Sequence, residues 1–209
     1  MPYGYLGQNQ PNQTVSNSGV FSITDVAELQ SQGKLGGSLE LITETSFSSN
    51  QNLDFTNIKE DIYDVHIVQV TQDCTGDPQN FIRLSNDNGS TFEASNYKYC
   101  WYVNDSVSAG GETRSNSSTQ MYLNYGGGIG ANELQNFTYI FYDLGNPNKY
   151  STVTQQTVVL SSVASVHSFI GGASYSVAET INAIRIYIVS GFRDGTAKLY
   201  GYKQWVLWD

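Results

Sequence analysis

The chain has 209 residues, of which 14% are charged and 39% hydrophobic, and it contains 15 Tyr, 9 Phe and 3 Trp. A chain of this length can bury a full core as one domain, and its wealth of aromatic and small polar residues is typical of β-rich proteins. The net charge of −9 and the scattered placement of Lys and Arg disfavour a nucleic-acid partner, because phosphate binding needs clustered basic residues.

The first 20 residues, beginning MPYGYLGQNQPNQ, are polar and contain almost no residue that would enter a core. They lack the basic and apolar regions of a signal peptide, and no apolar run is long enough to span a membrane. We therefore expect a soluble protein, made in the cytoplasm, with an extended N-terminal arm.

Residues 22–33 carry the signals of one short helix, with Thr24 or Ser22 as its cap and Gly33 at its end. The arm and this helix form the first predicted segment, residues 1–37. We expect this segment to attach the protein to a partner.

Residues 38–209 form the second predicted segment, which consists of strands separated by turn residues. We predict strands near residues 38–47, 62–72, 79–85, 97–103, 119–125, 136–143, 150–161, 183–190 and 195–203. Short strands with polar loops, without alternating helices, indicate an all-β fold: a two-sheet antiparallel β-sandwich of the jelly-roll type.

The last two strands show the clearest pattern. Isoleucines alternate with larger polar side chains in AIRIYI at 183–188, which predicts a half-buried strand. Ala197, Leu199 and Gly201 are predicted to share one face of the strand that follows.

Two motifs suggest chemistry or local structure. GGGIGA at 126–131 matches a loose dinucleotide-binding pattern, but no long helix follows it, so a flexible loop is the better interpretation. SNDNGSTF at 85–92 matches the Asp-box pattern, in which Asp87 and Gly89 would organise a hairpin turn. Calcium binding near Asp87 is left open.

The candidates for catalysis and metal binding are few. The two histidines, His66 and His167, show no metal-ligand spacing, and the chain has no G-x-S-x-G motif. The densest acidic cluster lies at residues 60–64, and a hydrolase with converging carboxylates is a minor alternative. We predict a protein that is not an enzyme and has no metal or cofactor.

The two cysteines do not form a disulfide framework. Cys74 is expected in a polar loop and Cys100 in a buried strand. Free thiols are the favoured state, and a bridge between the two is left open.

Aromatic and apolar residues near both ends of the chain are the candidates for partner binding, because aromatic rings anchor many interfaces. They are Tyr3, Tyr5, Leu6, Val20, Phe21, Trp205 and Trp208.

Three segments resemble parts of tailed-bacteriophage structural proteins, especially those of marine and cyanobacterial phages. IRIYIVSGFRDGTAKLYGYK, at 184–203, is similar to the closing hairpin of their β-sandwich module, so the resemblance implies that the last two strands form a hairpin. GVFSITDVAELQSQGKLGG, at 19–37, and FIRLSNDNGSTFEASNYKY, at 81–99, resemble pieces of tail-fibre and virion proteins. The three segments cover about a third of the chain and include no active-site signature.

The resemblance implies a virion structural protein: a capsid decoration protein or a head- or tail-fibre adaptor, assembled in the host cytoplasm and held through the N-terminal arm. Its expected partners are other copies of itself and capsid, tail or fibre subunits, without nucleic acid or membrane. The alternative is a carbohydrate-binding module of a tail fibre that recognises a receptor, with a glycan as its ligand.

Overall fold

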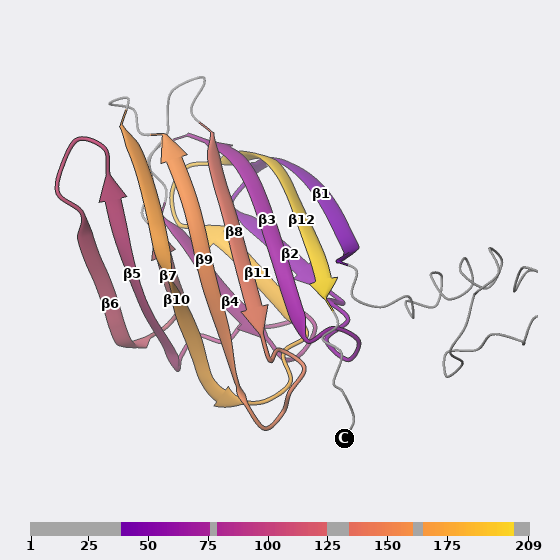
Figure 1. The fold of residues 1–209 in the computed structure, drawn as a ribbon. Helices are drawn as coiled ribbons and strands as arrows, with labels where there is room; N and C mark the ends of the chain where they lie inside the picture. Colours follow the sequence, from indigo (N-terminus) through magenta and orange to yellow (C-terminus); the bar gives the residue numbers. More distant parts are fainter. Residues whose placement is uncertain (1–38, 76–78, 125–133, 161–164, 203–209) are drawn as a thin grey trace, which may run out of the picture. The chain divides into compact units, whose positions relative to one another are not determined.

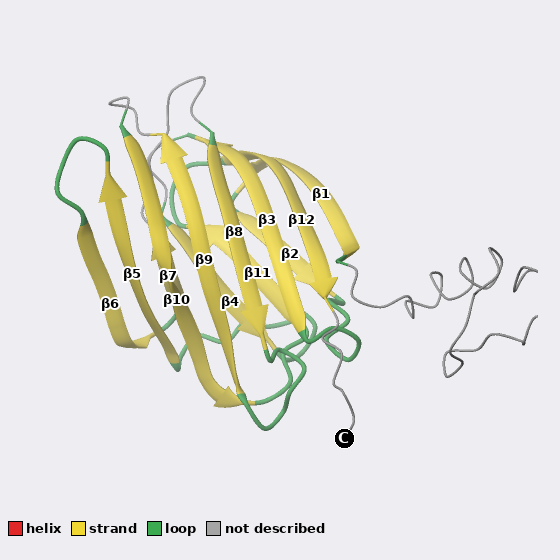
Figure 2. Ribbon diagram, in the orientation of Figure 1, coloured by secondary structure: helices red, strands yellow, loops and turns green. Residues whose placement is uncertain are grey.

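The computed structural model describes residues 39–75, 79–124, 134–160 and 165–202, and these form strands and no helix (Figure 2). The strands are β1 (Glu40–Asn50), β2 (Asn52–Thr56), β3 (Val65–Cys74), β4 (Asn80–Ser85), β5 (Tyr97–Asp105), β6 (Gly111–Ser118), β7 (Met121–Asn124), β8 (Gln135–Tyr142), β9 (Tyr150–Leu160), β10 (Val166–Ala178), β11 (Ala183–Ile188) and β12 (Arg193–Tyr202). Within these ranges no helix could cross a lipid bilayer.

The strands pair antiparallel in two sheets that pack face to face (Figure 1). The large sheet has the order β1-β12-β3-β8-β9-β10-β5-β6, and the small sheet has the order β2-β11-β4-β7. The chain passes from one sheet to the other in the connections β1–β2, β3–β4, β7–β8 and β11–β12. Two four-strand layers, β1-β12-β3-β8 and β2-β11-β4-β7, therefore have the strand order of a jelly roll. The predicted β-sandwich is confirmed.

Two hairpins extend the jelly roll on one side. The hairpin β5–β6 is inserted between β4 and β7, and the hairpin β9–β10 is inserted between β8 and β11. β9 pairs with β8, and β10 pairs with both β9 and β5, so the insertions add four strands to the large sheet. The large sheet is twice as wide as the small one for this reason.

Alternation of side chains places the core between the sheets. In β9 every second residue from Ser151 to Val159 is buried and the residues between them are exposed, as expected for a strand with one buried face. Large aromatic side chains fill the space between the sheets, among them Tyr97, Tyr139 and Phe141. The Tyr97 hydroxyl accepts a hydrogen bond from the Leu84 amide at 2.9 Å, which satisfies its polar atom inside the core.

The nine predicted strands all correspond to strands of the structure, and three strands were missed. β6, GETRSNSS, has no apolar residue that would reveal an alternating pattern. β10, VHSFIGGASYSVA, is interrupted by a glycine pair and small residues. β2 has only five residues, NLDFT. A pattern of apolar residues cannot identify strands whose side chains are small or polar.

Some finer predictions were wrong. The last two strands do not form a hairpin, because β11 pairs with β2 and β4 whereas β12 pairs with β1 and β3. Cys74 lies in β3 and is buried, and Cys100 lies in β5 and is exposed. Both cysteines are free thiols, as favoured. The helix predicted at 22–33 lies outside the described residues.

Candidate functional site

The residues predicted to bind a partner, Tyr3, Tyr5, Leu6, Val20, Phe21, Trp205 and Trp208, lie outside the described residues, as does the glycine loop at 126–131. Their role stays a prediction. The other candidate sites lie on the β-sandwich.

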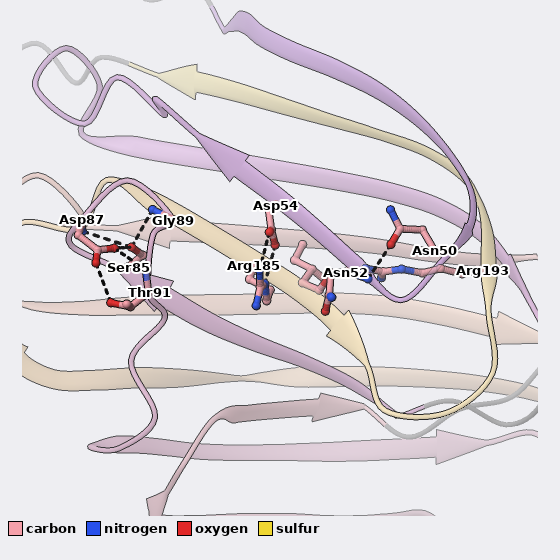
Figure 3. Close-up of polar contacts among 10 residues, drawn as sticks. Asn50, Asn52, Asp54, Ser85, Asp87, Gly89, Thr91, Arg185 and Arg193 are labelled. Atoms are coloured by element: carbon pink, nitrogen blue, oxygen red, sulfur yellow. Dashed lines mark hydrogen bonds and ion pairs between the residues drawn. The ribbon is translucent and has the colours of Figure 1, made fainter.

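The turn after β4 has the hydrogen bonding expected of the Asp-box motif (Figure 3). The Asp87 carboxylate accepts hydrogen bonds from the Thr91 amide at 2.9 Å and from the hydroxyls of Thr91 and Ser85, both at 2.7 Å. These donors lower the pKa of Asp87 to about 2. Gly89 occupies the left-handed region with φ of +85°. The carboxylate oxygens of Asp87 are thus engaged within the turn.

The turn is nevertheless not a hairpin between neighbouring strands. β4 belongs to the small sheet and β5 to the large sheet, so the chain crosses between layers after the turn. The predicted local structure at Asp87 and Gly89 is confirmed, and the expectation of a hairpin there was wrong.

His167 contacts a serine and an aspartate, but not in the arrangement of a catalytic triad. Its Nε2 atom lies 3.2 Å from the Ser165 hydroxyl and 3.5 Å from a carboxylate oxygen of Asp105. A triad needs the nucleophile and the carboxylate on opposite ring nitrogens, so that one orients the ring while the other loses its proton. Here both groups face the same nitrogen, and the geometry does not activate Ser165.

His66 is a structural residue. Its Nε2 atom lies 2.9 Å from the Ile58 carbonyl oxygen, and its side chain is fully buried beside Tyr63. Burial lowers the pKa of His66, because the interior disfavours the charged ring. The ring therefore stays neutral near neutral pH.

The acidic residues at 60–64 lie in the loop between β2 and β3, and Asp143 lies in the loop between β8 and β9. Glu60, Asp61, Asp64 and Asp143 line a depression of about 320 Å³ at one end of the sandwich, together with Tyr63, Gly145, Asn146 and Pro147. Across the described ranges, no group of three or more His, Cys, Asp or Glu side chains is placed to hold a metal ion.

The outer face of the small sheet carries a charged and aromatic cluster. Arg185 in β11 forms a two-bond ion pair with Asp54 in β2, with N–O distances of 2.7 and 2.6 Å (Figure 3). The guanidinium also lies 4.0 Å above the centre of the Phe92 ring. Beside it, Arg83 lies over the Tyr187 ring and donates a hydrogen bond to Gln120. These groups are partly exposed and form a polar surface with aromatic rings.

A buried polar network joins the two sheets near one end of the sandwich. The fully buried Arg193 donates hydrogen bonds to the Gln72 side chain and to the Ile186 carbonyl oxygen. Gln72 in turn donates to Asn80 at 3.2 Å and to Gln135 at 2.9 Å. Burial lowers the pKa of Arg193 to about 10. Because each of these four side chains is buried, we assign the network to structure.

The outer face of the large sheet lacks charge over its central part. The adjacent strands β8, β9 and β10 contain no Asp, Glu, Lys or Arg. Their outward side chains include the exposed Val158, Leu160, Val166 and Ile170. The charged residues of this face lie to either side: Asp73, Glu44, Asp194 and Lys198 on β3, β1 and β12, and Lys98, Glu112 and Arg114 on β5 and β6.

This uncharged face was missed by the sequence analysis, although a signal was present. The segment from 134 to 178 contains only one charged group of each sign, Asp143 and Lys149, and both lie between β8 and β9. A sandwich strand usually carries charge on its solvent side, so a long charge-poor segment with strand alternation indicates a covered outer face.

No protein-family model matches the chain, and no curated protein matches it.

Proposed function

We propose that the protein is a structural protein of a tailed-bacteriophage virion, a capsid decoration protein or a head- or tail-fibre adaptor, that acts by binding other subunits. The jelly roll alone does not decide between functions, because this fold serves many of them. The observation that carries the proposal is the uncharged outer face of β8, β9 and β10. Depletion of charge in the centre with charge at the rim is typical of protein–protein interfaces.

The sequence resemblance supports the same function. Two of the three resembling segments, at 81–99 and 184–203, include β4, β11 and β12, which belong to the jelly roll itself. In this proposal residues 1–37 attach the protein to a neighbouring capsid, tail or fibre subunit, and the sandwich covers or projects from the particle.

Quantitative mass spectrometry of purified virions tests the proposal. A copy number equal to that of the major shell protein, or a simple fraction of it, would indicate a decoration protein. A handful of copies would indicate a tail or fibre component. Absence from the particle would overturn the proposal.

A glycan-binding module is the second candidate, favoured by the cluster on the small sheet. Arg185, Asp54 and Tyr187 offer hydrogen-bonding groups beside aromatic rings, which is the combination that polar ring-shaped ligands require. A glycan array with the full chain tests it. Binding that is lost in Arg185→Ala and kept in Lys198→Ala would support this candidate, and an array without binding would remove it.

A further inference from the structure

The four described strands of the small sheet carry only three charged residues, two arginines and one aspartate. These residues form one row across the sheet, because Asp54 of β2 lies opposite Arg185 of β11, and Arg185 lies opposite Arg83 of β4. Their side chains share the outer face, since the residues on either side of each one are buried. Like charges directly opposite one another destabilise a sheet, so the facing arginines need an explanation.

Asp54 compensates the charge of only one of the two arginines. Both of its carboxylate oxygens accept hydrogen bonds from Arg185, whose guanidinium also lies against the Phe92 ring (Figure 3). Phe92 follows directly on the turn organised by Asp87, so this turn helps to shape the same surface. The row of two arginines and one aspartate therefore keeps one uncompensated positive charge.

That charge belongs to Arg83. Of the four arginines in the chain, Arg114 and Arg185 form ion pairs and Arg193 is buried, whereas no carboxylate of a described residue lies within ion-pair distance of Arg83. Arg83 is half-buried, and its Nη2 atom donates a hydrogen bond to the Gln120 side chain at 3.3 Å. Its Nε atom is buried without an acceptor. A guanidinium with N–H groups to spare is suited to bind a carboxylate or another oxyanion.

Aromatic rings lie beside this charge. Tyr187 of β11 is opposite Phe81 of β4, and Phe81 is opposite Tyr122 of β7, with ring centres 5.6 and 5.1 Å apart. The Arg83 guanidinium lies over the Tyr187 ring, and the Tyr187 hydroxyl donates a hydrogen bond to Gln120. Half-buried rings next to hydrogen-bond donors and acceptors match a sugar, which has both an apolar ring face and hydroxyl groups.

We propose that the row formed by Asp54, Arg185, Arg83 and Gln120 binds an acidic glycan, with Arg83 binding the carboxylate or sulfate group of a sugar beside Tyr187. An oxyanion supplies the acceptor that the Arg83 N–H groups lack in the protein, and the sugar ring uses the polar and aromatic groups around it. This inference rests on the glycan-binding candidate for the function. It adds the class of the sugar and the residue that selects it.

A glycan array probed with the full chain tests the inference. The array carries neutral glycans, glycans with uronic or sialic acids, and sulfated glycans. We expect binding to acidic glycans in preference to neutral ones. The separate responses of the carboxylated and sulfated glycans identify which oxyanion Arg83 binds.

Variants of two arginines connect the binding to this row. We expect Arg83→Gln to weaken the binding of the preferred acidic glycan about tenfold or more, because a hydrogen-bonded charge is lost. Arg114→Gln is the matched control, since it makes the same substitution at an exposed arginine of β6 and should leave the affinity unchanged. Arg83→Lys keeps the charge but not the planar fork of donors, so its affinity should lie between those of the wild type and Arg83→Gln. Circular dichroism checks that the variants are folded.

Thermal unfolding of the unaltered chain provides a measurement that needs no variant. The preferred acidic glycan should raise the melting temperature, because it binds the folded state. Polyglutamate carries carboxylates without a sugar ring and should leave the melting temperature unchanged.

Three outcomes would overturn this inference: a preference for neutral glycans, equal affinities of the wild type and Arg83→Gln, or an equal rise in melting temperature with polyglutamate, which would assign the row to an acidic protein partner. Binding of neutral glycans alone would leave the glycan-binding candidate standing and remove only the inference about Arg83. An array without any binding would remove both, and the copy number in virions would still decide the structural role separately.

Discussion

At the residue scale, Asp87 illustrates how one side chain organises a loop. Its carboxylate accepts three hydrogen bonds from Ser85 and Thr91. Removing the carboxylate therefore removes the hydrogen bonds that hold the turn between β4 and β5 together. The neighbouring Asn88 and Gly89 both have positive φ, a conformation that needs such local support.

We predict that Asp87→Ala lowers the melting temperature of the protein by a few degrees. The Asp87 pKa is lowered to about 2 from an ordinary value of 3.8, so the carboxylate stabilises the fold above pH 3.8 and loses this effect as the pH falls through 2. The difference in melting temperature between wild type and variant should therefore shrink below pH 4. Thermal unfolding followed by circular dichroism between pH 7 and about 2 measures it.

Asp87→Asn is the control for this prediction. The amide keeps one acceptor oxygen but has no titrating group, so its melting temperature should lie between those of the wild type and Asp87→Ala. A difference between wild type and Asp87→Asn that stays constant from pH 7 to 3 would contradict the role given to the Asp87 charge.

At the element scale, the inserted strand β10 depends on close packing at a glycine. Gly171 faces the interior side of the large sheet, next to Trp101 of β5. A methyl group added there would lie 2.5 Å from the Trp101 Cβ and 2.6 Å from its Cα, well inside van der Waals contact. The pairing of the two hairpins therefore leaves no room for a side chain at this position.

We predict that Gly171→Ala reduces the free energy of unfolding by about 1–3 kcal/mol, the usual cost of overpacking. Gly111→Ala, on the neighbouring β6, is the matched control, because an added methyl group there meets nothing within 4 Å. Urea unfolding of both variants measures the difference. An equal effect of the two substitutions would show that strand propensity, and not the contact with Trp101, sets the cost.

At the scale of the whole molecule, the described strands contain a complete jelly roll with its own core. The strands of both jelly-roll layers lie between residues 40 and 202, and their buried residues form the main hydrophobic cluster. The sandwich therefore has what it needs to fold without the first 20 residues.

We predict that removal of residues 1–20 leaves a cooperatively folded sandwich but abolishes binding to the particle. Thermal unfolding measures the first effect, and cosedimentation with particles lacking the protein measures the second. The untruncated chain is the control in both assays. A truncated chain that loads fully onto particles would contradict the role proposed for the arm.

The sequence by itself determined the all-β class, the positions of nine strands and the turn at Asp87. Alternation of apolar and polar residues indicates which side chains face a core, and Asp-Asn-Gly indicates a turn. Both signals can be recognised from the sequence because they depend only on neighbouring residues. Local patterns could not predict the polar strand β6 or the glycine-containing strand β10. These segments are strands because they form hydrogen bonds with neighbouring strands in the sheet.

Only the tertiary structure decided how the strands are paired and what lies on each face. The separation of β11 and β12 into different sheets and the exposure of Cys100 depend on pairing between distant segments, which no local pattern specifies. The same holds for the uncharged face of β8, β9 and β10. Its side chains are outward in each strand, but they become one surface only when the sheet brings the three strands side by side.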